Sequence, residues 1–235
     1  MNDRDNSIEN ALVLLSGGLD STVALAVAQR RYKLKTVLFF EYNQHALERE
    51  RSAVRRIAGF YQLPIEYVKL PWLGEGSSSS LTREVLQKED DFRNVEVGQE
   101  NKRDPSSAWV ENRNGIFLNI AAAFASWKQC SVIITGFNRE ESRLFPDNSS
   151  IYVDAVNRAL DIGVRKDIRV ESPTLDFDKK RIAKEGMKLS IPWKYLWSCY
   201  GGGKLMCGKC YSCMKLKSAI EGMGAAEVIS FAEEE

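Results

Sequence analysis

The residues with the clearest chemical potential form a short run of glycines and small hydroxyl residues near the start of the chain. Residues 15–25 read LSGGLDSTVAL. The paired glycines allow a tight turn and bring bare amides close to phosphate oxygens, and Ser16, Ser21 and Thr22 add hydroxyl donors. The run lacks the lysine of GxxxxGK[ST] and does not fit GxGxxG. We expect a loop that binds pyrophosphate; a turn of small residues before a helix is the plainer alternative.

A second group is a block of cysteines near the end of the sequence. Of the five cysteines, four cluster there: Cys199, Cys207, Cys210 and Cys213. An odd count and tight clustering argue against a disulfide framework. Four thiolates are the ligand number of a tetrahedral structural zinc, and Gly208 suits the turn between two of them. An iron–sulfur cluster or a reactive, persulfide-carrying cysteine remains an alternative. We interpret Cys130, which stands apart, as a buried core thiol.

The phosphate loop resembles the SGGxDS loop of the N-type ATP pyrophosphatases, which cleave ATP between its α and β phosphates. Together with the cysteine block, the chain is similar over nearly its whole length to the 7-cyano-7-deazaguanine synthase family. The similar segments are LSGGLDST at 15–22, Tyr42–Gln44, Arg113-Asn114 with IFLNIAAAFA, Gly136–Asn138, Phe145–Asp147, Asp178-Lys179, Trp197–Tyr200 and CGKCYSC. The WSCY lead and the CGKCYSC ending are the specific part, because the loop alone indicates only the superfamily.

The resemblance implies an ATP-dependent ligase that forms a C–N bond. Its substrates would be 7-carboxy-7-deazaguanine, ammonia, and ATP with Mg2+. Adenylation makes the carboxylate oxygen a good leaving group, and ammonia then gives an amide. A second adenylation, on the amide oxygen, lets AMP leave and yields the nitrile. The protein would mainly position the reactants and stabilise the charge of the departing pyrophosphate.

The resemblance also assigns candidate site residues. The catalytic candidates are Ser16, Asp20, Ser21 and Lys179. The ATP-binding candidates are Leu15, Ser16, Gly17, Gly18, Leu19, Asp20, Ser21, Thr22 and Gly136. The substrate-binding candidates are Arg113, Asn114, Phe145 and Asp147. Lys179 and Arg113 would neutralise phosphate or carboxylate charge, with a surface ion pair as the alternative for each. Asp20 would hold Mg2+ or, with Ser21, cap the following helix.

Some residues depart from the family pattern, and other functions stay open. Asn43 stands where many members have glycine, 110–112 where a proline is common, and Asn148-Ser149 where many have Cys-Arg. The last change leaves a related deazapurine amidating enzyme as an alternative. A tRNA-thiolating member of the superfamily is another, although such enzymes usually add an RNA-binding domain or basic face and need a catalytic cysteine. A zinc-containing module that only senses nucleotide is the non-enzymatic alternative.

Alternating strands and helices must position these groups. Hydrophobic periodicity predicts strands at 11–15, 35–42, 65–70, 131–135 and 168–172, and helices at 20–31, 44–62, 113–128, 149–160, 178–189 and 211–223. This order predicts an α/β, Rossmann-like fold with a parallel five-stranded sheet and helices on both faces, plus a small C-terminal zinc-binding segment. The polar stretch 74–107 is long for a connection, so we expect a lid or partly disordered insertion.

Length and composition fit one large domain. The 235 residues are 44% hydrophobic, and 33 Lys and Arg nearly balance 32 Asp and Glu. We expect an ATP pyrophosphatase domain at 1–195, with a cysteine segment and closing helix at 196–235 packed on it. The balanced charge lacks the excess of basic residues that is typical of nucleic-acid-binding proteins. No apolar run approaches the ~18 residues of a membrane span. We therefore expect a cytoplasmic enzyme without nucleic-acid or membrane partners, and the resemblance suggests a homodimer.

Overall fold

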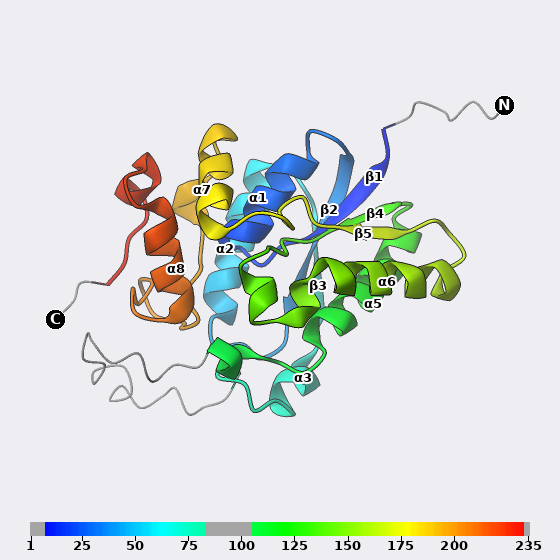
Figure 1. The fold of residues 1–235 in the computed structure, drawn as a ribbon, viewed down its shortest axis with the longest axis horizontal. Helices are drawn as coiled ribbons and strands as arrows, with labels where there is room; N and C mark the ends of the chain where they lie inside the picture. Colours follow the sequence, from blue (N-terminus) through cyan, green and yellow to red (C-terminus); the bar gives the residue numbers. More distant parts are fainter. Residues whose placement is uncertain (1–7, 83–104, 233–235) are drawn as a thin grey trace.

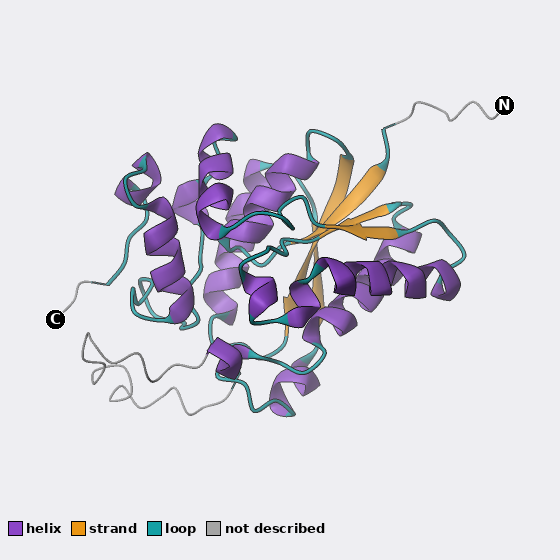
Figure 2. Ribbon diagram, viewed as in Figure 1, coloured by secondary structure: helices purple, strands orange, loops and turns teal. Residues whose placement is uncertain are grey.

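A parallel sheet forms the centre of the molecule (Figures 1 and 2). The structure is a computed structural model that describes residues 8–82 and 105–232. The strands are β1 (Asn10–Leu14), β2 (Lys33–Glu41), β3 (Ile65–Lys69), β4 (Val132–Ile134) and β5 (Arg169–Glu171). Their order in the sheet is β3-β2-β1-β4-β5, and every neighbouring pair is parallel. The predicted five-stranded parallel sheet is confirmed.

The strand order creates a crevice where the direction of winding reverses. The chain runs from β1 outward through β2 to β3, then crosses to the other side of β1 to form β4 and β5. In open parallel sheets, ligands bind at such a reversal, beyond the carboxyl ends of the strands. Residues 15–18 follow β1 and Gly136 follows β4 closely, so both lie at this crevice.

Helices cover both faces of the sheet, as predicted. They are α1 (Leu19–Ala28), α2 (Leu47–Phe60), α3 (Pro71–Glu75), α5 (Arg113–Trp127), α6 (Ser150–Gly163), α7 (Lys179–Lys188) and α8 (Tyr211–Ile220). Strand side chains alternate between faces, so Val13 and Phe39 pack with α1, α2, α7 and α8, whereas Leu12 and Leu38 pack with α5 and α6. Figure 1 shows these two groups of helices on opposite sides of the strands. No helix in the described ranges is both long and apolar enough to cross a membrane.

The C-terminal block joins the core on the α1 side of the sheet. Cys199, Met206 and Leu216 belong to the same buried cluster as Val13. Met206 and Phe231 form an isolated bridge that fastens the last described residues to the cysteine block. The closing helix α8 therefore packs on the main core.

The start of α1 differs from the expectation that Asp20 or Ser21 caps it. The N-cap is Gly18, without a side-chain cap, and both predicted residues lie inside the first turn. The helix begins directly at the loop because the Gly18 carbonyl accepts the Thr22 amide at 3.2 Å. The Asp20 carboxylate is consequently available for other contacts.

The expected insertion at 74–107 is described only at its ends, since 83–104 lie outside the described residues. The short helix α3, which hydrophobic periodicity does not predict, begins with Pro71 and reaches the start of the insertion. The two ends meet where the Ser80 amide donates to the Ser107 carbonyl at 2.8 Å. The amide of His45, which follows β2, donates to the Leu81 carbonyl at 2.9 Å, so these ends lie near the carboxyl end of β2.

Candidate active site

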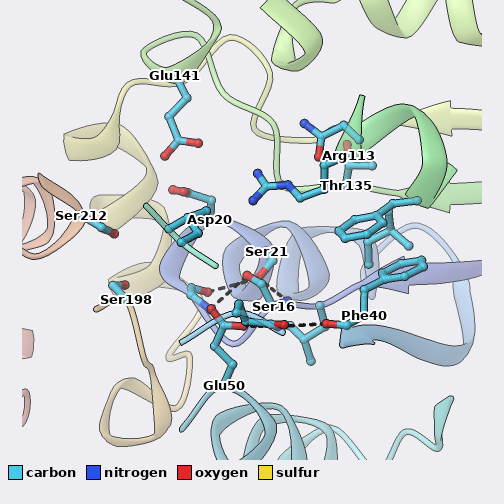
Figure 3. Close-up of a pocket in the computed structure, with 18 of the residues that line it drawn as sticks. Ser16, Asp20, Ser21, Phe40, Glu50, Arg113, Thr135, Glu141, Ser198 and Ser212 are labelled. Carbon is cyan, nitrogen blue, oxygen red and sulfur yellow. Dashed lines mark hydrogen bonds between the residues drawn. The ribbon is translucent and has the colours of Figure 1, made fainter. Parts of the chain in front are cut away.

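The loop between β1 and α1 is held by its own hydroxyl groups. The Oγ atoms of Ser16 and Ser21 lie 3.1 Å apart, and the Gly18 amide donates to the Ser16 Oγ at 3.4 Å. The hydroxyl of Thr22 donates to the Gly18 carbonyl at 2.7 Å. The first amides of an α-helix have no partner within the helix, so the N-terminal turn of α1 offers donors next to the serine hydroxyls. Figure 3 shows Ser16 and Ser21 together at the cavity.

Two glycines are required by close packing around this loop. Gly17 has φ +85°, and a Cβ there would lie 2.8 Å from the Ala53 Cβ on α2. A Cβ on Gly136 would lie 2.6 Å from the Ser21 amide nitrogen. The end of β4 therefore touches the first turn of α1, and α2 packs directly behind the loop.

A cluster of one cation and two carboxylates borders the loop. Lys179 Nζ contacts Asp20 Oδ2 and lies 2.7 Å from Glu141 Oε1. The Lys179 side chain is only 12% exposed, so a surface ion pair is not its role. Burial acts to lower the pKa of Lys179, but the two carboxylates outweigh it and hold that pKa above its usual value. The cation is thus fixed beside the phosphate loop.

Asp20 retains an unused oxygen within this cluster. Its Oδ1 is buried and has no hydrogen-bond partner. Burial raises the pKa of Asp20 to about 6, although the charge of Lys179 acts in the opposite direction. A buried carboxylate oxygen without a donor fits a hard cation such as Mg2+, which binds through one or two carboxylates and the phosphates of its nucleotide.

A cavity of about 280 Å³ opens over the loop at the crevice. It is lined by most predicted site residues: Leu15, Ser16, Gly18, Leu19, Asp20, Ser21, Arg113, Asn114, Gly136, Phe145 and Lys179. The other three, Gly17, Thr22 and Asp147, do not line it. Gly17 shapes the loop from behind, and the Thr22 hydroxyl is occupied by a backbone carbonyl.

Arg113 supplies positive charge on the far side of the cavity. It begins α5, and its Nη1 donates to the Tyr42 hydroxyl at 3.1 Å. The buried Asp147 lies near it, since the Arg113 charge acts to lower the pKa of Asp147 while burial raises it. Asp147 accepts a hydrogen bond from the Asn148 side chain at 3.1 Å, so it contacts a residue that lines the cavity.

Four aromatic residues, Phe40, Tyr42, Phe117 and Phe145, line the cavity. Phe40 and Phe117 stack with ring centroids 4.0 Å apart and planes 6° apart. The Tyr42 ring lies 5.7 Å from that of Phe117, and Phe145 stacks on Trp109 at 6.1 Å. Such surfaces suit a planar heterocycle, because aromatic rings prefer offset stacking.

The four C-terminal cysteines converge on one point. Their Sγ atoms all lie within 4.8 Å of one another, compatible with the roughly 3.8 Å between sulfurs that share a tetrahedral zinc with 2.3 Å bonds. The amides of Gly201 and Cys207 donate to Cys199 Sγ at 3.3 and 3.4 Å. Gly208 has φ +73°, which provides the expected turn. This donor set fits a metal ion such as zinc. Cys130 is buried elsewhere, as expected.

The segment that leads into the cysteine block is hydrogen-bonded to the phosphate loop. The Trp197 amide, two residues before Cys199, donates to the Gly17 carbonyl at 2.9 Å. Ser198 and Tyr200 from the same segment line the cavity. The C-terminal segment therefore completes the rim of the site.

Several residues at the cavity were not anticipated from the sequence. Glu141 follows β4 and is oriented by Asn138, whose Oδ1 accepts its amide at 2.9 Å. Glu50 on α2 also lines the cavity and accepts a hydrogen bond from Gln44 at 2.8 Å. Gln44 lies in a segment noted for its resemblance, but nothing in the spacing of Glu50 distinguished it from the other charged residues of α2.

The sheet order, the crevice and the glycine-rich loop define a nucleotide-binding α/β protein of Rossmann-like architecture. The chain matches the family model described as "Queuosine biosynthesis protein QueC" over residues 10–224. It belongs to this family, and the resemblance inferred from the sequence is confirmed.

Curated relatives match the chain over almost their full lengths. The 7-cyano-7-deazaguanine synthase of Pelotomaculum thermopropionicum is 42% identical over 217 residues, which cover 91% of this chain and 97% of that protein. The synthase of Carboxydothermus hydrogenoformans is 42% identical over 215 residues, covering 92% and 100%. Among solved structures, the NH3-dependent NAD synthetase of Campylobacter jejuni has a TM-score of 0.49 and 15% identity, covering 82% of this chain and 69% of that one.

Proposed function

We propose that the protein converts 7-carboxy-7-deazaguanine and ammonia to 7-cyano-7-deazaguanine (preQ0), with ATP consumed to AMP and pyrophosphate. Family membership supports this reaction. The observation that carries it structurally is the hydrogen bond between Trp197 and Gly17, which joins the phosphate loop and the cysteine block, the two specific features of the sequence, at one cavity.

The ATP phosphates would bind at the loop. The Ser16 and Ser21 hydroxyls and the amides that begin α1 would receive the departing pyrophosphate. Leu15, Leu19 and Gly136, which line the cavity, would border the nucleotide. Lys179 would neutralise the charge that develops, and Asp20 Oδ1 would hold Mg2+, which supplies further positive charge to the phosphates when bound. Gly17 and Thr22 would keep the loop in shape.

The deazaguanine would bind on the Arg113 side. The stacked pair of Phe40 and Phe117 offers a flat surface for its ring system. Arg113 would attract the carboxylate, and Asn114 and Phe145 would fix the ring in the plane that exposes the carboxylate to ATP. Asp147 would help to position Arg113 through its charge and Asn148 through a hydrogen bond.

The chemistry follows from the poor leaving ability of a carboxylate oxygen. Attack of the carboxylate on the α-phosphate turns that oxygen into part of AMP, and ammonia displaces it to give an amide. Repetition on the amide oxygen leaves the nitrile. The side chains of the cavity hold the reactants in line and exclude water, which would otherwise hydrolyse the acyl adenylate.

We assign a structural zinc to Cys199, Cys207, Cys210 and Cys213. Four thiolate ligands leave no open position for catalysis. We also infer that 196–235 is a segment packed on the 1–195 domain, that the protein is cytoplasmic, and that it acts on small molecules as a homodimer. The cysteine block in the α1-side core supports the first of these inferences.

The reaction is tested by incubating the protein with ATP, Mg2+, ammonium and 7-carboxy-7-deazaguanine. We expect the nitrile by mass spectrometry, with one AMP released for each of the carboxylate and amide adenylations. A control without the deazapurine should release no AMP. Substrate-dependent AMP release that ends at the amide would point to an amidating enzyme instead, and no release would reject the assignment.

A further inference from the structure

Glu50 is a carboxylate at the cavity that the proposed ATP and deazapurine sites leave unused. Among the described residues that line the cavity, the carboxylates are Asp20, Glu50 and Glu141. Asp20 and Glu141 both contact Lys179. Glu50 forms no salt bridge with any residue of the described chain, so its negative charge is available to a ligand.

The Glu50 carboxylate is held in a fixed direction. Gln44 Nε2 donates to Glu50 Oε2 at 2.8 Å and to the Phe40 carbonyl at 3.0 Å, while the Tyr42 amide donates to Gln44 Oε1 at 2.8 Å. Gln44 is therefore anchored to the end of β2, and it uses one donor to orient Glu50. The second oxygen, Oε1, has no hydrogen bond within the described residues and remains free to accept one.

Glu50 lies beside the place where ATP would react. Its backbone carbonyl is 3.4 Å from the position of a Cβ on Gly17, so this turn of α2 packs directly against the phosphate loop. In Figure 3, Glu50 approaches Ser16 from the α2 side, while Arg113 and Glu141 lie on the other side of the loop. A ligand on Glu50 would thus face an acyl adenylate opposite Arg113.

The proposed reaction requires a group that binds ammonium and accepts a proton from it, and none of the residues with a proposed role at the ATP and deazapurine sites does this. At neutral pH ammonia is present mainly as ammonium, which has no lone pair for attack. A group at the cavity must attract this cation and take a proton from it. Lys179 and Arg113 repel ammonium, and the two carboxylates beside Lys179 are engaged by that lysine and, at Asp20, by the proposed Mg2+.

We propose, on the basis of the function proposed above, that Glu50 is the catalytic residue that binds ammonium and accepts its proton. Ammonium gives one proton to Glu50 Oε1, and the freed lone pair attacks the carbonyl carbon of the acyl adenylate. The C–N bond forms, and the C–O bond to AMP breaks with its electron pair on the phosphate oxygen. The second proton lost by nitrogen passes to solvent, as does the proton on Glu50, which restores the carboxylate.

The surroundings of Glu50 suit a base. Burial raises the pKa of Glu50 to about 7, although the hydrogen bond from Gln44 and the charge of Arg113 act to lower it. The Tyr42 phenol also faces this carboxylate, and burial raises its pKa further above its usual value, so it stays neutral. A base with a pKa near the working pH is the most effective acceptor.

The first experiment compares Glu50→Gln with the wild type using two nucleophiles. The variant keeps the shape of the side chain and its bond with Gln44. With ammonium at neutral pH, we expect kcat/KM to fall by about 100-fold or more, as is usual for loss of a general base. Hydroxylamine is uncharged at this pH, so hydroxamate formation should stay within about threefold, as should pyrophosphate exchange driven by 7-carboxy-7-deazaguanine without any nucleophile.

The second measurement is the pH dependence of kcat/KM for ammonium. In the wild type it should rise through about pH 7, as Glu50 ionises, and then level off. In Glu50→Gln it should keep rising in proportion to free ammonia, so activity recovers at high pH. Pyrophosphate exchange serves as the reference in both proteins, because ionisation of Asp20 would affect it equally.

Glu48→Gln is the matched control, since Glu48 lies on the same helix and its side chain is 76% exposed. It should behave as the wild type. Glu50→Asp, which keeps a base on a shorter side chain, should show an intermediate loss and replaces the Gln variant if that variant does not fold.

Unchanged use of ammonium by the Glu50 variants would overturn the inference. So would a parallel loss of hydroxylamine reaction and pyrophosphate exchange, because Glu50 would then serve ATP binding. A wild-type protein without substrate-dependent pyrophosphate exchange would instead reject the proposed function itself.

Discussion

The contacts of single residues explain why Lys179 is the best candidate to stabilise departing pyrophosphate. Its ammonium group is held by Asp20 and Glu141, which come from α1 and from the turn after β4. A lysine fixed in this way needs little reorganisation when phosphate charge develops beside it. The sequence indicated Lys179 and Asp20, but Glu141 could not be foreseen because it is brought there by the fold of the 138–141 turn.

We predict that Lys179→Met abolishes substrate-dependent pyrophosphate release, with a loss of at least about 100-fold. It should also lower the free energy of unfolding by about 3–5 kcal/mol, because two partly buried carboxylates lose their cation. Urea denaturation and pyrophosphate assays measure the two effects. Adding Asp20→Asn should restore part of the stability but none of the activity. Lys184→Met, an exposed change on the same helix, should alter neither.

At the level of elements, the site depends on how closely β4 approaches α1. Gly136 allows the end of β4 to touch the first turn of α1, which sets the direction of the amides at the loop. The order and ranges of these elements were predictable, since apolar runs and helical periodicity agree with the observed strands and helices to within a few residues. The start of α1 was not, because Gly18 caps it through backbone geometry alone.

Gly136→Ala should therefore displace α1 from β4. A Cβ 2.6 Å from the Ser21 amide has no room, so we expect about 1–3 kcal/mol of destabilisation and a marked rise in KM for ATP. Gly59→Ala is the control, since a Cβ at this helical position meets nothing within 4 Å and should stabilise α2 by about 0.5–1 kcal/mol. Thermal unfolding and ATP titration of both variants measure the contrast, and an unchanged KM in the Gly136 variant would contradict the prediction.

At the level of the whole molecule, the C-terminal segment contributes Ser198 and Tyr200 to the lining of the candidate active site. Its cysteines lie in the core on the α1 side of the sheet, and the Trp197 amide donates a hydrogen bond to the Gly17 carbonyl of the phosphate loop. The spacing of the cysteines was enough to predict that they converge. The contact with Gly17 was not predictable, and neither was the bond from Gln44 to Glu50, because such contacts depend on how loops from separate elements meet.

We predict one zinc per chain and loss of function on its removal. Cys210→Ser should lose the metal, measured by mass spectrometry of the purified protein, and lower the midpoint of thermal unfolding. ATP turnover should fall with it, because the Trp197 segment would no longer be fixed to the loop. Cys130→Ala should keep its zinc. Iron, or no metal, in the wild type would contradict the assignment, as would full ATP turnover by a zinc-free variant.

The hydrogen bond from Trp197 to Gly17 also has a consequence for how the protein folds during its synthesis. The partners are separated by most of the sequence, and contacts between distant residues form late because their loops are costly to close. During synthesis, which proceeds from the N-terminus, the glycine-rich loop leaves the ribosome long before the tryptophan that completes it. An unfinished chain therefore lacks the segment that completes the rim of the nucleotide pocket, and we expect it not to turn over ATP until that segment has been added.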